Sequence, residues 1–329
     1  MFTIRQFEKT DQDYAKAVSV VNRVWAEYPD TADEWKEGDN RRATKVKWAR
    51  FLAEVNGKAV GVGSYGQPLD MYHPDRFSID LDVLPEHRQN GIGTALYDHL
   101  MTQLAPYKPA TLCTHTREDY TGGVRFLVQH GFDEAMREWE SRLDPATVNL
   151  AEWTKYESRM AQNGIELKTV RELEIDPDRD RKLYEMEWLV EKDVPAPKPP
   201  TKMPFAEWQK IWTRTNLIPD AWWIAVQDGQ YVGQTNLWGS QARADLLYTG
   251  LTGVVRSHRR MGIASALKVQ AVRYAQENGI GEVRTWNEAN NAGMLDINVR
   301  LGFVRQPAHI EYLKTLREEP EYTEGKETN

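Results

Sequence analysis

The chain has 329 residues, and its 42 lysine and arginine residues against 49 aspartate and glutamate residues give a net charge of −7. At about 100–200 residues per domain, this length predicts two domains, and a hydrophobic fraction of 40% excludes global disorder. The acidic balance argues against a general nucleic-acid binder, and no apolar run approaches the roughly 20 residues that span a bilayer. The single cysteine, Cys113, and a start without an apolar signal segment favour a cytoplasmic protein.

The chain repeats itself. Residues 83–96 (VLPEHRQNGIGTAL) align with residues 254–267 (VVRSHRRMGIASAL), and residues 51–61 align with residues 223–233 at nearly the same offset. Three aligned blocks in one order, the third being the HGF and LGF tripeptides, indicate a duplicated domain of about 150 residues. We expect an N-terminal domain over 1–145, a connecting helix over 146–165, a C-terminal domain over 166–316 and a disordered tail over 317–329.

In the first repeat, a strand over 2–7 precedes helical segments and a β-hairpin. The hairpin turn is Asn56-Gly57, a pair that supplies the positive φ angles of a tight turn. Residues 77–83 alternate in polarity as a strand does, and a helix with apolar residues at helical spacing follows from Ile92.

The second repeat gives the same order from a strand over 166–173. Its hairpin turn is Asp228-Gly229, and five prolines within 194–204 predict a loop before it. The strand over 246–255 carries Gly250 and Gly253, which indicate a bulge. Together the two repeats predict an α+β fold with layered sheet and helices.

A strand-to-helix loop rich in small residues stands at the same place in both repeats, at 88–93 (RQNGIG) and 259–264 (RRMGIA). Such a loop turns successive backbone N–H groups toward one point, and the helix dipole adds positive charge there. The loops therefore predict two anion sites suited to a pyrophosphate.

Both repeats resemble the GNAT superfamily of N-acetyltransferases, whose signature [RQ]-x-x-G-x-[GA] matches both loops; Asn291 with Gly302-Phe303 matches a second signature. The resemblance implies two tandem GNAT domains, each a mixed central sheet flanked by helices, and acetyl-coenzyme A as cofactor. In repeat two it implies coenzyme contacts from Val254, Val255, Arg259, Arg260, Met261, Gly262, Ile263, Ala264, Ser265, Asn287 and Asn291. In repeat one it implies contacts from Val83, Leu84, Arg88, Gln89, Asn90, Gly91, Ile92, Gly93 and Thr94.

The repeats differ in a way that separates their roles. Repeat one has Tyr120 where the resemblance expects asparagine, and Gly123 where alanine is usual. Because a tyrosine hydroxyl cannot replace both ends of an amide, we assign catalysis to repeat two. Repeat one is then a copy that stabilises repeat two by packing, with or without bound coenzyme.

The resemblance also implies a carboxylate base and a tyrosine acid, but repeat two has Tyr248 and Asn298 at those positions, our candidate catalytic residues. The base then comes from solvent or from another carboxylate. Asp80 and Asp82 are candidates that also suit the solvated face of a strand, and Glu288 equally suits a capping role. Backbone N–H of Val254 is the candidate for stabilising the oxyanion.

The sequence thus predicts an N-acetyltransferase that acts on a primary amine of a small molecule or peptide by direct attack in a ternary complex. The alternative is a non-catalytic acyl-coenzyme A-binding or sensor protein. A dinucleotide-binding oxidoreductase is set aside because neither loop reads G-x-G-x-x-G. No spacing indicates a metal site, and we expect neither nucleic-acid nor membrane partners, with a monomer or homodimer as the assembly.

Overall fold

The computed structural model describes residues 1–322, and the chain divides into two compact units. The first unit comprises Met1–Met136 together with the segment from Ile310, and the second comprises Arg137–His309. The last strand of each repeat thus belongs to the compact unit of the other repeat. This exchange explains why the division falls at neither of the boundaries expected at 145 and 166.

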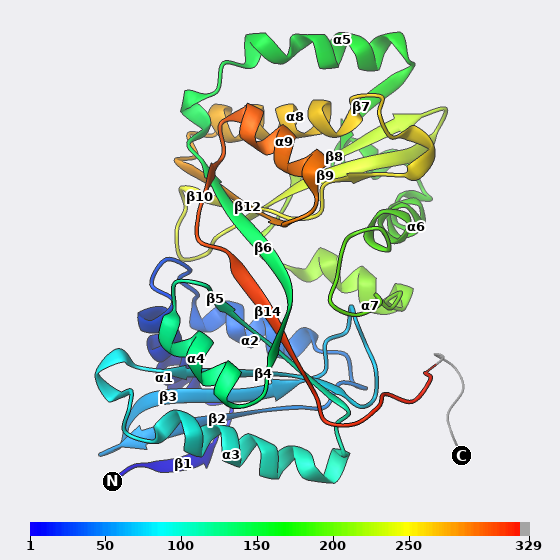
Figure 1. Ribbon diagram of the computed structural model, residues 1–329. Helices are drawn as coiled ribbons and strands as arrows, with labels where there is room; N and C mark the ends of the chain where they lie inside the picture. The colour runs from blue at the N-terminus through cyan, green and yellow to red at the C-terminus, as the bar shows by residue number, and fades with distance from the viewer. Residues whose placement is uncertain (323–329) are drawn as a thin grey trace. The chain divides into compact units, whose positions relative to one another are not determined.

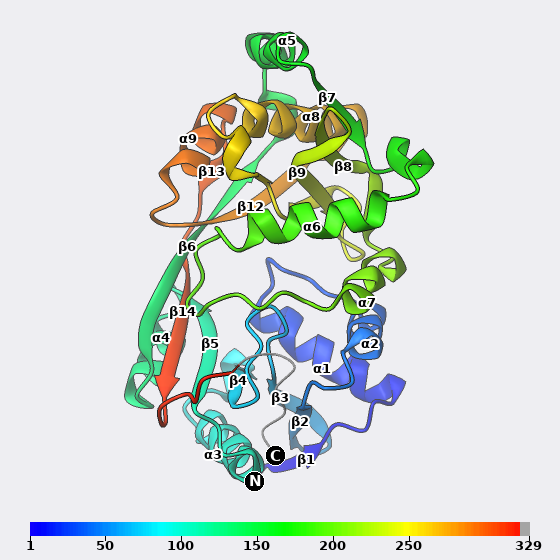
Figure 2. The same cartoon turned by 90° about the vertical axis from the view of Figure 1, so that its right-hand side faces the viewer.

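The first unit is a mixed sheet in the order β1-β2-β3-β4-β5-β14, in which β4 and β5 are parallel. Helices α1 and α3 both pack on β3 and β4, and Figures 1 and 2 show them on opposite faces of the sheet. The elements are β1 (Thr3–Gln6), α1 (Asp11–Val24), α2 (Ala32–Arg41), β2 (Trp48–Val55), β3 (Lys58–Gly66), β4 (Arg76–Val83), α3 (Ile92–Leu104), β5 (Thr111–Arg117), α4 (Thr121–Gln129) and β14 (His309–Thr315).

The second unit repeats the arrangement with the order β6-β12-β10-β9-β8-β7. Helix α8 packs on β8 and β9, α6 covers the other face, and α5 packs on the outer side of α8 (Figure 2). The elements are β6 (Asp133–Leu143), α5 (Thr154–Gln162), β7 (Ile165–Thr169), α6 (Arg179–Glu191), α7 (Phe205–Trp208), β8 (Leu217–Gln227), β9 (Gln230–Gly239), β10 (Leu246–Thr249), β11 (Gly253–Val254), α8 (Ile263–Glu277), β12 (Glu282–Glu288), α9 (Ala292–Leu301) and β13 (Val304–Arg305). The predicted fold class, with a mixed sheet and flanking helices in each unit, is confirmed.

Local sequence explains the element boundaries. Helix α2 begins with a capping box in which Thr31 and Glu34 exchange side-chain and backbone hydrogen bonds. The predicted hairpin turns have positive φ at both central residues, 49° and 75° at Asn56-Gly57 and 49° and 73° at Asp228-Gly229. The proline-rich stretch 194–204 is a loop, as predicted.

Part of the predicted disordered tail has a defined place in the first unit. Arg76 is buried, and its guanidinium donates to both carboxylate oxygens of Glu319, at 3.0 and 2.8 Å. The Arg317 guanidinium similarly bonds Asp75 at 2.7 Å. Residues 317–322 therefore complete the first unit, and the rest of the predicted tail, 323–329, lies outside the described residues.

Candidate active site

The fourth strand of the first unit has a free edge. Its parallel pairing with β5 ends at Ser78, whereas β4 continues to Val83. The N–H of Leu84 donates to the Val60 carbonyl on β3. Because bonded and non-bonded pairs alternate along antiparallel strands, the backbone groups of Leu81 and Val83 point away from β3. They face the side from which β5 has diverged, where an extended ligand can add strand-like hydrogen bonds.

The corresponding strand of the second unit carries the predicted bulge. Parallel pairing with β12 ends at Tyr248. Thr249 then lies opposite Leu237, and Gly253 lies opposite Gln234. The chain thus advances by four residues on this strand and by three on β9, so this strand has one extra residue. The first unit lacks the extra residue, since β3 and β4 keep one register from Ser78 to Val83. The two glycine positions therefore identified a real irregularity, and the two units differ there.

The loop after each of these strands has the geometry of an anion cradle. Gln89 and Gly91 have φ angles of 60° and 77°, and α3 starts at Ile92. At the matched positions, Arg260 and Gly262 have φ angles of 68° and 86°. Residues with left-handed φ lie directly before each helix. They orient the first backbone N–H groups of the helix outward, where these groups remain available to an anion.

The motif arginine ties each loop to the strand before it. Arg88 Nε donates to the Val83 carbonyl at 2.9 Å, and Arg259 Nε donates to the Val254 carbonyl at 3.0 Å. The Nε–H of each guanidinium is thus used structurally. Both predicted coenzyme loops are therefore preorganised by their own side chains.

The surroundings of the two loops differ sharply. In the first unit, no atom lies within 4 Å of the position of a Cβ added at Gly91, and Thr94 is exposed. In the second unit, Tyr156 of α5 lies 3.1 Å from the corresponding position at Gly262, and Ser265 is only 5% exposed. The helix that was expected to connect the domains therefore packs beside the second loop.

The second loop also carries its own counter-anion. Asp193, just after α6, accepts from Arg256 Nε at 2.7 Å and from Arg259 Nη2 at 2.5 Å. Hydrogen bonding to these arginines lowers the pKa of Asp193 to about 2, so the carboxylate is charged throughout the neutral range. Among residues 1–322, no carboxylate pairs with Arg88 in this way. The second loop therefore holds one carboxylate against Arg256 and Arg259, whereas the first loop presents Arg88 without such a carboxylate.

A carboxylate of unusual basicity lies on the free strand of the first unit. Trp25 Nε1, at the end of α1, donates to Asp82 Oδ1 at 2.8 Å. Burial raises the pKa of Asp82 to about 7, against the lowering effect of the Trp25 hydrogen bond. Of the two roles considered for Asp82, a base and a residue of the strand's solvated face, the hydrogen bond from Trp25 favours the first.

Aromatic contacts hold this carboxylate in place. The Tyr120 ring packs on Trp25 with centroids 4.9 Å apart, and its hydroxyl donates to the Val24 carbonyl at 3.3 Å. His115 of β5 lies near Trp25, and its Nδ1 is 3.9 Å from Asp80 Oδ1. The residue that departs from the expected asparagine, Tyr120, therefore positions Trp25 and through it Asp82.

The candidate residues of the second unit bond to one another or to nearby backbone groups. Asn298 is 1% exposed and donates to Asn287 Oδ1 at 2.5 Å, and Asn291 caps α9 by accepting from the Met294 N–H. The Tyr248 ring lies against Trp286. The structure therefore brings Asn287 and Asn298 together, and it commits part of their hydrogen-bonding capacity to each other.

Two other predicted candidates have structural partners. Glu288 accepts from the backbone N–H and side-chain amide of Asn290, which is the capping role considered from the sequence. His258 Nε2 lies 2.8 Å from Gln227 Oε1, consistent with loop packing. Neither residue is aimed at the diverging strands as Asp82 is.

The first loop and strand are the more open of the two. Gly91 leaves its side open, Arg88 supplies positive charge, and the edge at Leu81 and Val83 suits an amide-containing arm. The second loop offers the same backbone but has Tyr156 and Asp193 beside it.

Comparison with known proteins decides the family. A model of the acetyltransferase (GNAT) family matches residues 13–132 and 181–303, which is more than half of the chain and one region in each unit. The chain belongs to this family. It is 32% identical over 90 residues to an N-alpha-acetyltransferase of Arabidopsis thaliana, MAK3, and the match spans 27% of this chain and about half (47%) of that relative.

Solved GNAT structures share the fold along the whole chain. A GCN5-related N-acetyltransferase from Sphaerobacter thermophilus matches with a TM-score of 0.70 and 20% identity, covering 98% of each chain. A tandem GNAT protein from the clavulanic acid biosynthesis pathway matches with a TM-score of 0.74 and 17% identity, over 96% of this chain and 98% of its own. Within residues 1–322, no helix is long and apolar enough to cross a membrane.

Proposed function

We propose that the protein is an N-acetyltransferase that transfers the acetyl group of acetyl-coenzyme A to a primary amine, and that the first unit carries the reaction. The observation that supports this most is Asp82, a carboxylate with a pKa near 7 on the strand whose edge is freed beside an open anion cradle. In the sequence-based hypothesis catalysis belonged to the second unit; the covered loop and the mutually bonded amides there favour the first.

The chemistry follows from the ionisation of amines. A lysine-like amine has a pKa of about 10.4 and arrives protonated, so a base must remove a proton before nitrogen can attack. When the pKa of the base lies near the working pH, a substantial fraction of the base is deprotonated, and that form is still basic enough to accept the proton. Asp82 meets this requirement, whereas an ordinary exposed aspartate with a pKa of about 3.9 is a much weaker base.

The remaining requirements are met by backbone groups. When bound, acetyl-coenzyme A supplies an activated thioester. The cradle at Arg88 to Thr94 would hold its pyrophosphate, and the freed N–H groups of Leu81 and Val83 would bind the arm and stabilise negative charge on the acetyl oxygen. Trp25 holds Asp82 by a hydrogen bond, and Asp82 stands between Leu81 and Val83 in the strand, so the proposed base and donor groups belong to consecutive residues.

A thiol-release assay over a panel of primary amines, combined with calorimetry of acetyl-coenzyme A binding, tests the proposal. Asp82→Asn should lower kcat about 100-fold, within the usual contribution of general-base catalysis, and leave coenzyme affinity unchanged. Tyr248→Phe is the matched variant in the second unit and should retain activity. If Tyr248→Phe lost activity and Asp82→Asn kept full activity, the proposal would be contradicted, and the second unit would be the catalytic one.

The alternative of a non-catalytic coenzyme-binding protein has one observation in its favour, the carboxylate of Asp193 that occupies the motif arginine of the second unit. Coenzyme binding without turnover of any amine in the panel would support that alternative and reject the proposed activity.

A further inference from the structure

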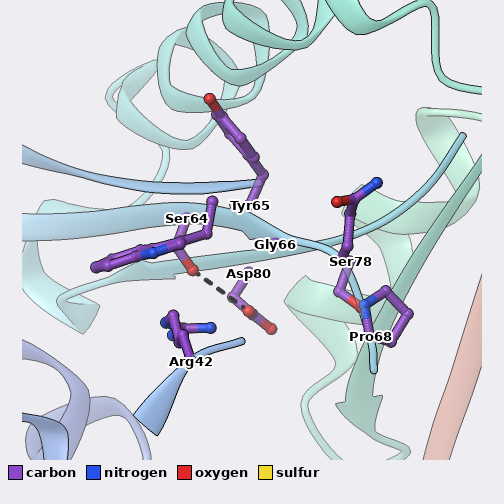
Figure 3. A pocket seen from close by; sticks show the side chains of 9 residues that line it. Arg42, Ser64, Tyr65, Gly66, Pro68, Ser78 and Asp80 are labelled. Atoms are coloured by element: carbon purple, nitrogen blue, oxygen red, sulfur yellow. Dashed lines mark hydrogen bonds between the residues drawn. The ribbon is translucent and has the colours of Figure 1, made fainter. Parts of the chain in front are cut away.

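A small pocket of about 180 Å³ opens on one face of the sheet in the first unit. It is lined by Trp48 of β2, Ser64 of β3, Ser78 and Asp80 of β4, and Arg42 at the end of α2 (Figure 3). A pocket of this volume suits a small molecule rather than a folded peptide segment.

The pocket lies beside the proposed reaction centre. Ser78 is the residue at which β4 loses its pairing to β5, and Asp80 and Asp82 follow it at alternate positions. Alternate residues of a strand share a face, so Asp82 stands about 7 Å along the strand from Asp80. A ligand in the pocket therefore lies on the same face of β4 as the base that the proposed function requires.

One end of the pocket is negative. The Asp80 side chain is about half exposed (51%), and its carboxylate lies 3.4 Å from Ser64 Oγ, as the dashed line in Figure 3 marks. A half-solvated carboxylate with a neighbouring hydroxyl is suited to hold an ammonium group by charge-assisted hydrogen bonds.

Arg42 adds a positive and rigid group to the lining (Figure 3). The Arg42 guanidinium lies 4.4 Å from the Trp48 ring centroid, and its Nε bonds Asp39 Oδ1 at 3.1 Å. Asp39 also bonds Arg50, at 3.0 Å, so two guanidinium groups share one buried carboxylate. One unit of positive charge is left over, and Arg42, being the more exposed of the two arginines, presents it to the pocket.

We propose that the acceptor is a small amino-carboxylate, whose ammonium group binds at Asp80 and whose carboxylate binds at Arg42. This proposal rests on the proposed function and narrows its substrate class. A planar guanidinium fixed by stacking and by Asp39 is preorganised for a carboxylate, and the Asp80 carboxylate rejects molecules that carry two anionic groups.

The experiment compares α- and ω-amino acids with their methyl esters and with the corresponding simple amines, using thiol release and calorimetry. The wild-type protein should prefer the best amino acid over its methyl ester by at least about tenfold, the value of one charge-assisted contact. Arg42→Gln should abolish that preference while keeping turnover of the ester. Arg42→Lys should restore part of it.

The second arm tests the negative end. Asp80→Asn should raise KM about tenfold for amino acid and ester alike, with the KM for acetyl-coenzyme A unchanged. Arg41→Gln, next to Arg42 but paired with Glu37 on the helix surface, is the matched control and should behave as wild type.

Failure of this proposal is distinguishable from failure of the proposed function. Turnover that favours esters or simple amines over amino acids, or an equal loss for all acceptors in Arg42→Gln, would overturn the amino-carboxylate site while leaving acetyl transfer intact. If no amine is turned over, calorimetric titration with amino acids decides: binding that is lost in Arg42→Gln supports the site, and no binding overturns it.

Discussion

The Asp193 carboxylate lies 2.5 Å from Nη2 of Arg259, the motif arginine of the second loop, and it also bonds Arg256. Arg88, the matched arginine of the first loop, has no carboxylate partner within residues 1–322. Two loops with the same backbone geometry therefore differ in the charge that they present to a ligand.

Asp193→Asn should give the second loop a measurable affinity for coenzyme A. Removing the internal anion leaves Arg256 and Arg259 uncompensated, and the gain should be about tenfold, the size of one charge-assisted contact. Calorimetry would then report a second site per chain where the wild type shows one. The free energy of unfolding should fall by about 1 kcal/mol, since the side chains of Arg256 and Arg259 are 75% and 43% exposed although that of Asp193 is 7% exposed. Unaltered stoichiometry would show that Tyr156, rather than charge, closes the loop.

The rate of acetyl transfer should depend on pH through Asp82. The pKa of this carboxyl is raised to about 7, so kcat/KM should fall as pH drops below 7 and the base becomes protonated. Trp25→Phe removes a hydrogen bond that lowers this pKa, and the acidic limb should therefore move to higher pH. An acidic limb that stays at the same pH in Trp25→Phe and Asp82→Asn would assign it to another group.

Lys268→Met should stabilise the second unit. The lysine is 2% exposed, and its Nζ lacks a hydrogen-bond partner among the described residues. Methionine has a similar unbranched shape without the charge, so the free energy of unfolding should rise by roughly 1–4 kcal/mol.

The pH dependence of that gain follows from linkage. Burial lowers the pKa of Lys268 to about 7 in the folded state, below its value of about 10.4 in the unfolded chain. The unfolded state therefore binds more protons between pH 7 and 10, and wild-type stability from this group rises over that range. Denaturant melts should show the largest difference from Lys268→Met near pH 7 and a shrinking one toward pH 10; a constant difference would contradict the assignment.

Glu319→Gln should destabilise the first unit. It removes the partner of Arg76, whose side chain is only 6% exposed, and leaves a buried guanidinium unpaired. Breaking such a pair costs about 3–5 kcal/mol, and we expect about 2–3 kcal/mol because Glu319 keeps some solvent contact. Glu321→Gln, an exposed neighbour, is the control. Equal thermal melting of both variants would show that the pair contributes little.

The sequence predicted the features that depend on neighbouring residues. Asn56-Gly57 and Asp228-Gly229 form the expected turns because their φ angles are a local property. Gly250 and Gly253 marked the bulge for a different reason, which is not local: a side chain at Gly253 would collide with Val190, and one at Gly250 with Asn236 and Trp238.

Features that depend on distant residues were not predictable from local patterns. Trp25 and Asp82 are 57 residues apart, and only the packing of α1 against the sheet buries the carboxylate. Asp193 reaches the second loop from the far end of α6. Both contacts change the expected roles of the repeats, because they set charge and burial rather than secondary structure.

The matched loop variants Gln89→Glu and Arg260→Glu test most directly whether the first unit holds the coenzyme. The two residues occupy the same left-handed position of their loops, with φ angles of 60° and 68°, so backbone strain is balanced. A like charge placed about 4 Å from a phosphate at a partly solvated site should raise KM for acetyl-coenzyme A at least about tenfold. We predict this rise in Gln89→Glu and wild-type kinetics in Arg260→Glu. The reverse result would contradict the account and place the working site in the second unit.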